Sequence, residues 1–129
     1  MELPITTILA SLSAIWLFVL SGHVIQQRRS AGVSLGAGDD PVLLRRTRAQ
    51  ANLTEYAPIF ILMIGLSELQ HGNAYVIATI ASLFMIARLA HGYALSFSEN
   101  SPRARFLGTV FTFIPLTAIA LYNLFIVVA

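Results

Sequence analysis

Long apolar segments separated by short polar ones dominate the pattern of this 129-residue chain. A membrane-spanning helix needs about 20 mostly apolar residues to cross roughly 30 Å of hydrocarbon. The first such segment runs from residue 5 to 27, and Arg28 and Arg29 end it. Two more apolar segments occupy residues 74–95 and 103–127. Each of these three segments is long enough to be a membrane-spanning helix.

The segment from residue 43 to 69 differs, because only its second half is apolar. Residues 57–69 are too few to cross a bilayer alone. The polar turns before them must then be helical too, facing other helices or an aqueous cleft, since lipid offers polar groups no partner. We therefore predict an all-α integral membrane protein, a four-transmembrane-helix bundle that forms a single membrane domain over residues 1–129.

Composition agrees with this prediction and adds an orientation. The chain is 57% hydrophobic and only 11% charged, whereas soluble domains contain about 25% charged residues. All eight basic residues are arginines that flank the first and third connections, while the termini and residues 70–73 have none. Because basic residues concentrate on the cytoplasmic side, we expect a multi-pass protein with connections one and three in the cytoplasm and both termini outside. The net charge of +2 thus reflects topology, and no nucleic-acid partner is expected.

The chain has no cysteine and only three histidines, which are widely separated. Disulfides and a cysteine nucleophile are therefore excluded, and no metal site is expected. Any thiol chemistry has to come from a bound ligand.

Polar residues follow one face of the second predicted helix. Arg48, Asn52 and Glu55 recur at i, i+4 and i+7, a spacing that places them on one stripe. Glu55 lies about 10 Å along the helix from Arg48, because seven residues rise 1.5 Å each. Arg88 and His91 form a similar stripe on the third helix. We expect Glu55 and Arg88 to pair or to share a polar ligand at matching depth.

Two interpretations of this polar cluster remain open. Glu55 and Arg88 could simply hold helices together, with neighbouring amides bonding across them. A buried ion pair is weak evidence of stability, however, since desolvation can exceed the Coulomb attraction. The surrounding arginines give the same end of the bundle an excess of positive charge. Such a pocket suits a ligand with more than one carboxylate and a peptide-like body.

The segment RTRAQANLTEYAPIF, residues 46–60, closely resembles the second-helix signature of the MAPEG family, the membrane-associated proteins in eicosanoid and glutathione metabolism. It looks most like the leukotriene C synthase branch. The spacing of Arg88 and His91, followed by Arg105, is similar to microsomal glutathione transferases and their bacterial relatives. The resemblance implies a homotrimer with glutathione sites between neighbouring subunits, open towards the cytoplasm.

The resemblance also implies roles for individual residues. Glutathione ligands are expected at Arg28, Arg48, Gln50, Asn52, Glu55, Tyr56, Arg88 and His91. Arg105 best matches the arginine that holds the glutathione thiol as thiolate, with Arg103 as the alternative because spacing across that loop varies. Many family members carry a tyrosine where this chain has Leu95, so one glutathione contact that the resemblance implies has no counterpart at this position.

Three functions follow from these observations. The first is a glutathione-dependent transferase or peroxidase acting on lipophilic electrophiles, with glutathione as co-substrate and a lipophilic small molecule or lipid entering from the membrane. A neighbouring guanidinium would supply the nucleophile, because it lowers the pKa of a thiol from its usual value near 8.5. The second is a non-catalytic lipid- or glutathione-binding protein on the same scaffold, which Leu95 favours. The third is a small multidrug exporter, a class that usually carries a carboxylate in its first helix, where this chain has none.

Overall fold

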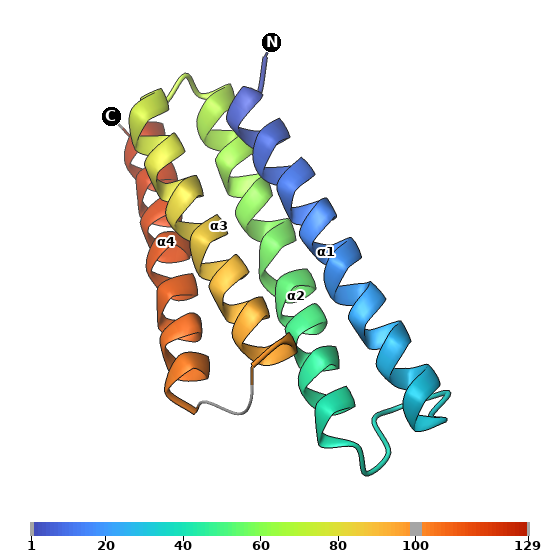
Figure 1. Ribbon diagram of the computed structural model, residues 1–129. Helices are drawn as coiled ribbons and strands as arrows, with labels where there is room; N and C mark the ends of the chain where they lie inside the picture. The colour runs from blue at the N-terminus through green and yellow to red at the C-terminus, as the bar shows by residue number, and fades with distance from the viewer. Residues whose placement is uncertain (1, 99–101, 129) are drawn as a thin grey trace.

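The chain folds into four antiparallel helices. The computed structural model describes residues 2–98 and 102–128, with the side chains of residues 102–105 left out. The helices are α1 (Pro4–Ala31), α2 (Pro41–Leu69), α3 (Ala74–Ser96) and α4 (Pro102–Val128). Figure 1 shows the N-terminal end of α1, the C-terminal end of α4 and the α2–α3 turn at one end of the bundle, with the α1–α2 connection, the end of α3 and the start of α4 at the opposite end. The predicted all-helical fold class is confirmed.

Two of the helices form the middle of the bundle. α2 contacts α1, α3 and α4, and α3 contacts α1, α2 and α4, whereas no described Cα of α1 lies within 8 Å of one in α4. At the centre, Phe60 of α2 stacks on Phe84 of α3 with ring centroids 3.7 Å apart, and both rings are fully buried. The polar first half of α2 is thus part of one of the two central helices.

α1 is longer than predicted. Arg28 and Arg29 do not end it, and the helix continues to Ala31. It stops at Gly32, whose φ of 67° is left-handed and whose N–H bonds to the Arg28 carbonyl. Glycine adopts this conformation without a Cβ penalty. The helix therefore extends beyond the apolar segment that ends at about residue 27, because arginines suit the negative C-terminal end of a helix and the backbone of Gly32 terminates it.

α2 begins two residues before its predicted start. Pro41 occupies its first turn, and Asp40 caps it by accepting hydrogen bonds from the backbone N–H groups of Val42 and Leu43. The second carboxylate oxygen of Asp40 accepts from Gln27 Nε2 at 2.7 Å. Asp40 therefore joins the end of α1 to the start of α2.

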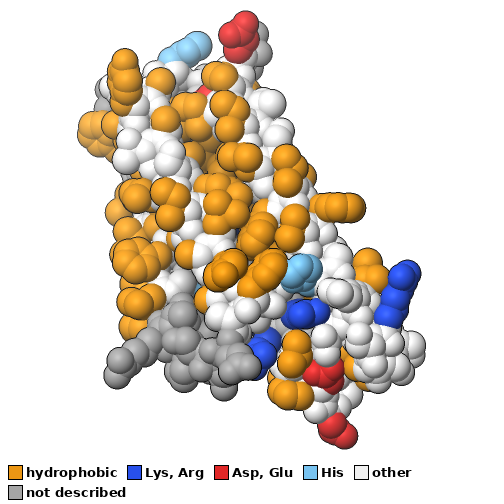
Figure 2. Space-filling model, viewed as in Figure 1, with side chains coloured by type: hydrophobic (Ala, Val, Ile, Leu, Met, Phe, Trp, Pro, Cys, Tyr) orange, Lys and Arg blue, Asp and Glu red, His pale blue; other side chains and the backbone are white. Residues whose placement is uncertain are grey.

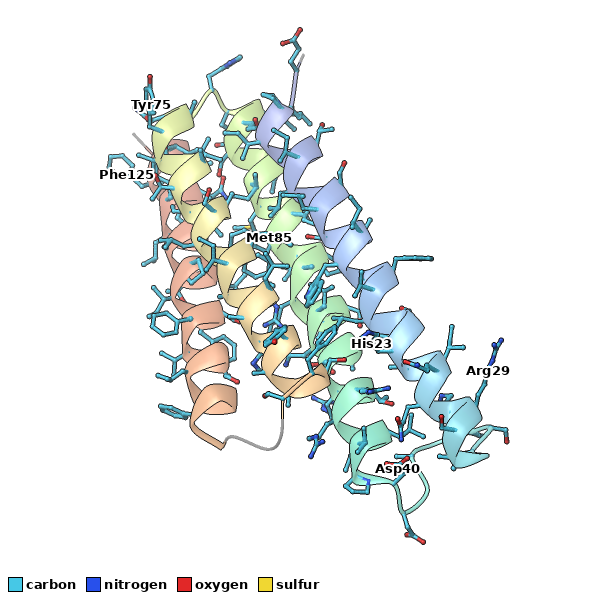
Figure 3. The ribbon with its side chains drawn as sticks, in the orientation of Figure 1. His23, Arg29, Asp40, Tyr75, Met85 and Phe125 are labelled. Atoms are coloured by element: carbon cyan, nitrogen blue, oxygen red, sulfur yellow. The ribbon has the colours of Figure 1, made fainter. Side chains whose placement is uncertain are left out.

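The surface fits a hydrocarbon environment. α1, α3 and residues 106–128 of α4 are each long and apolar enough to cross a membrane. Their outward side chains include Phe18 and Phe125, which are 81% and 67% exposed. Figure 2 shows hydrophobic side chains over most of the visible side and basic ones near the end with the α1–α2 connection. Figure 3 shows Arg29 near that end of the bundle with its side chain pointing outward from α1, while Tyr75 and Phe125 lie at the opposite end.

Polar contacts close the end of the bundle that carries the termini. The Glu68 carboxylate accepts hydrogen bonds from the backbone N–H groups of Ile5 and Thr6 and from the Thr6 hydroxyl, at 3.0, 2.8 and 2.6 Å. These N–H groups belong to the first turn of α1, where a helix has no internal acceptors. The last turn of α2 thus caps the first turn of α1. Nearby, Ser67 donates to Asn123 of α4 at 3.0 Å.

Candidate functional site

Arg88 is the most deeply buried charged residue among those the structure describes, with 1% of its surface exposed. Its Nη1 donates to Thr112 Oγ1 of α4 at 2.7 Å, and its Nη2 donates to Asn52 Oδ1 of α2 at 2.5 Å. Its Nε is buried without a hydrogen-bond partner. Both partners are neutral, so within the described chain this guanidinium has no hydrogen-bonded counter-ion.

Glu55 does not pair directly with Arg88, so of the two arrangements expected from the sequence only a shared polar ligand stays a prediction. Its carboxylate Oε1 instead lies 3.5 Å from Nη1 of Arg48, two turns earlier on the same helix. Both side chains are about half exposed, at 56% for Arg48 and 46% for Glu55. The reason is geometric, because Arg88 points into the seam between α2 and α4 whereas Glu55 stands on the outer side of α2.

Arg48, Asn52, Glu55 and Tyr56 nevertheless lie together on one side of α2. Tyr56 is partly buried and meets Phe113 of α4 edge-on, with ring centroids 5.5 Å apart. Asn52 links this stripe inward to Arg88. The structure therefore brings five of the predicted ligands, the fifth being Arg88, to the region where α2, α3 and α4 meet.

Gln50 and Arg28 belong to a different face. Gln50 Nε2 donates to Ser21 Oγ of α1 at 2.8 Å, since two residues beyond Arg48 a helix has turned by about 200°. Arg28 Nη1 donates to the Gly36 carbonyl at 2.6 Å and holds the α1–α2 connection. One copy of the chain thus does not gather all the predicted ligands on one side.

His91 lies at the α3–α4 seam. It is 4% exposed, and its Nδ1 is buried without a hydrogen-bond partner. The ring rests on Gly108 of α4, where an added Cβ would come 2.2 Å from Nδ1. Leu95, one turn further along α3, packs in the hydrophobic core. The departure from the family pattern at position 95 therefore concerns a core position in this chain.

The candidate thiolate-stabilising residues fall at the start of α4. Arg105 and its alternative Arg103 belong to its first turns, but their side chains lie outside the described residues. Among the described residues, no group of three or more histidine, aspartate or glutamate side chains could hold a metal ion.

Thr112 is a site residue that the sequence did not predict. It bonds Arg88 and also donates to the Gly108 carbonyl at 2.8 Å. Threonine on an apolar transmembrane helix commonly satisfies its hydroxyl in this way, so it carries little signal by itself. Gly108 and Thr112 are four residues apart and therefore lie on the same face of α4. That small, polar face is the only sequence feature that points to a contact between Thr112 and Arg88.

This arrangement is chemically suited to an anionic ligand. Removing a charge from water costs several kcal/mol, which neutral hydrogen bonds offset only in part. A ligand carboxylate bonded to Arg88 would supply the counter-ion that this guanidinium lacks. Arg48 offers a second, accessible guanidinium on the side of α2 that carries Asn52. Asn52, Glu55 and Tyr56 supply neutral and acidic groups for the polar remainder of such a ligand. The site is therefore a cationic cluster beside apolar walls within a membrane-spanning helical bundle.

Comparison with known proteins identifies the family. The model of the MAPEG family matches residues 6–125, nearly the whole chain. None of the curated proteins compared matches it significantly. The fold and its apolar helices define a multi-pass integral membrane protein with an all-helical bundle. The chain belongs to the MAPEG family, whose members act in glutathione and eicosanoid metabolism.

Proposed function

We propose that this protein is a glutathione-dependent transferase that conjugates or reduces lipophilic electrophiles within the membrane. The observation that carries the proposal is the buried Arg88 guanidinium with neutral partners, beside the accessible Arg48 on α2. Glutathione has two carboxylates and a peptide body, and so matches both cations and the amide of Asn52. Family membership supports the same class of ligand.

In this proposal the ligands come from two copies of the chain. Arg48, Asn52, Glu55, Tyr56 and Arg88 act from one protomer, with His91 one helical turn from Arg88 on α3. Arg28 and Gln50 stand on the α1 side and act towards a neighbouring protomer. A homotrimer with glutathione between subunits would join the two faces. The basic end of the bundle, and with it the site, faces the cytoplasm.

The chemistry assigned to Arg105 is stabilisation of the thiolate. A guanidinium lowers the pKa of a nearby thiol, which releases its proton to water and enriches the nucleophile at neutral pH. With 1-chloro-2,4-dinitrobenzene as a model electrophile, the sulfur forms a C–S bond, the C–Cl bond breaks and chloride leaves. No side chain has to accept a proton in this step.

The test is the conjugation rate of purified protein with glutathione and 1-chloro-2,4-dinitrobenzene. Wild type is expected to turn over, and Arg105→Ala to lower the rate at least tenfold while Arg29→Ala does not. A drop in Arg103→Ala alone would move the role to that residue. Glutathione binding without turnover on this electrophile or on hydroperoxides would contradict a transferase and support the non-catalytic alternative.

A further inference from the structure

A cluster of polar and aromatic side chains joins three helices at the point where α3 ends. His23 Nδ1 of α1 lies 3.2 Å from Oγ of Ser96, the last residue of α3. Arg46 Nη1 of α2 donates to the His23 carbonyl at 3.1 Å. The Phe97 ring packs on the His23 ring with centroids 4.2 Å apart, and Tyr93 stacks on Phe97 at 5.1 Å. These five residues, here called the interfacial cluster, include none of the predicted glutathione ligands.

The interfacial cluster lies at the level where the apolar surface of α3 stops. Ser96 ends a helix that is apolar enough to cross a membrane, whereas α1 continues from His23 to Ala31, about 12 Å further. Figure 1 shows α1 and α2 extending beyond the end of α3, and Figure 3 shows His23 beside that end. Tyr93 and Phe97 are 59% and 45% exposed. Aromatic side chains are enriched at the level of lipid headgroups, so the cluster is placed between hydrocarbon and headgroups.

Arg46 carries a charge without a bonded counter-ion. Among the residues that the structure describes, the only ion pair joins Arg48 to Glu55, and Nε of Arg46 is buried without a hydrogen-bond partner. Asp40 interacts with the Arg46 charge without forming an ion pair. The two oxygens of Asp40 accept hydrogen bonds from Gln27 and from the first amides of α2. Arg46 is therefore held in place by a backbone carbonyl and keeps donors for an anion.

The surroundings of Arg46 select the kind of anion. A small soluble anion would contact the guanidinium alone, because Tyr93 and Phe97 present exposed rings beside it. A phospholipid matches both features, since its phosphate is an acceptor for arginine and its acyl chains suit the rings. A zwitterionic headgroup carries its own cation and therefore neutralises Arg46 less well than an anionic one. Basic pockets between membrane-spanning helices bind anionic headgroups in this way.

We propose that the interfacial cluster binds an anionic phospholipid, whose phosphate accepts hydrogen bonds from the Arg46 guanidinium and whose acyl chains pack on Tyr93 and Phe97. The bound lipid stabilises the junction of α1, α2 and α3 and is not a substrate. Glutathione is not needed for this binding, because Arg46 faces α1, away from the seam that holds Arg88 and from the side of α2 that carries Arg48.

Trp16 provides a reporter beside the interfacial cluster. It is the only tryptophan of the chain, and its ring stacks on Phe97 with centroids 6.4 Å apart. Bromine atoms on an acyl chain quench tryptophan fluorescence at short range. Purified protein is reconstituted in phosphatidylcholine vesicles that contain increasing fractions of brominated phosphatidylglycerol, or of brominated phosphatidylcholine for comparison. The two quenching curves give the relative affinity of the cluster for the two lipids.

Wild type is expected to prefer phosphatidylglycerol about fivefold, which corresponds to about 1 kcal/mol, the usual contribution of one basic residue near an anionic lipid surface. Arg46→Gln should abolish most of this preference. Arg29→Gln removes the same charge from the same end of the bundle, but Arg29 is exposed and points outward. This matched control should therefore keep most of the wild-type preference. Equal quenching by the two lipids in wild type, or the same preference in the two variants, would overturn the proposal.

Should Arg46→Gln fail to fold, photo-crosslinking tests the site in wild type directly. A phosphatidylglycerol with a diazirine near the start of one acyl chain is expected to label residues 16–23 and 92–97 saturably. Unlabelled phosphatidylglycerol should compete better than phosphatidylcholine, because only the former is anionic. Saturable labelling confined to other residues, or equal competition by the two lipids, would refute an anionic-lipid site at the interfacial cluster.

Discussion

Arg88 of α3 and Asn52 of α2 are joined by a hydrogen bond between a buried guanidinium and a neutral amide. Thr112 is the other described partner, so the charge has no carboxylate bonded to it. Stability alone does not favour such an arrangement, because a desolvated charge without a counter-ion costs free energy. The arrangement is favourable for a protein that gains an anionic ligand there.

Replacing Arg88 should therefore separate ligand binding from folding. In Arg88→Met the desolvation cost disappears while Asn52 loses a donor, so the free energy of unfolding without ligand should stay within about 2 kcal/mol of wild type. Glutathione at 100 times its Kd should stabilise wild type by about 2.7 kcal/mol and Arg88→Met hardly at all. Thermal unfolding in nanodiscs measures both values. Equal stabilisation of the two proteins would exclude Arg88 as a ligand.

Gly108 is required by the contact between α3 and α4. A Cβ there would meet His91 Nδ1 at 2.2 Å, so Gly108→Ala should destabilise the protein by about 1–3 kcal/mol, the usual cost of overpacking. Gly22→Ala is the control, because its Cβ has nothing within 4 Å, and it should be neutral or stabilising by up to about 1 kcal/mol. Adding His91→Ala should recover part of the loss in a double-mutant cycle. Simple additivity would show that the two residues do not touch.

Glu68 should anchor the start of α1. It accepts three hydrogen bonds from Ile5 and Thr6, and bonds to a charged group contribute about 1.5–3 kcal/mol. Glu68→Ala is expected to lower the free energy of unfolding by about 2 kcal/mol and to speed hydrogen exchange of the first α1 amides. Glu2→Ala, in an exposed residue before the helix, is the control. Unchanged exchange at Ile5 and Thr6 in Glu68→Ala would refute the cap.

Asp40 should make the α1–α2 connection sensitive to acid. The hydrogen bond from Gln27, and then those from the Leu43 and Val42 amides, hold the pKa of this carboxyl below its usual value. Because the folded pKa lies below the unfolded one, the ionised group stabilises the fold above pH ~4. That contribution is lost as pH falls through the folded pKa.

The measurement is thermal unfolding between neutral and acidic pH. Asp40→Asn keeps the helix cap but cannot titrate, so its stability should fall less steeply in acid than that of wild type. Gln27→Ala removes the largest cause of the lowered pKa and should also flatten the profile. Identical slopes in all three proteins would show that Asp40 does not contribute.

The helices and part of the site were predictable because they follow from local rules. Apolar length located the membrane-spanning helices, and the seven-residue spacing of Arg48 and Glu55 placed them on one face. The same arithmetic puts Gln50 on the opposite side of α2, where it bonds Ser21. The apolar pattern locates the end of the hydrophobic segment at about residue 27 but not the end of α1, which the left-handed backbone of Gly32 sets.

The partners of Arg88 were not predictable from spacing. They depend on how α4 packs against α3, which brings Thr112 to one side of the guanidinium and His91 onto Gly108. Depth along the helix suggested Glu55 as the partner, but depth does not fix the direction in which a side chain points. The packing of the helices decides that Thr112, which faces the contact between α3 and α4, bonds Arg88, whereas Glu55, which lies at a similar depth, does not.

Calorimetric titration of glutathione into wild type, Arg48→Ala and Arg29→Ala tests the central claim most directly. Arg48 is more than half exposed, so its removal should leave the fold intact and report on binding alone. The account predicts saturable binding to wild type and Arg29→Ala, and an affinity at least tenfold lower, about 1.4 kcal/mol, in Arg48→Ala. Equal affinity in all three proteins, or no binding to wild type, would contradict a glutathione site on this face of α2.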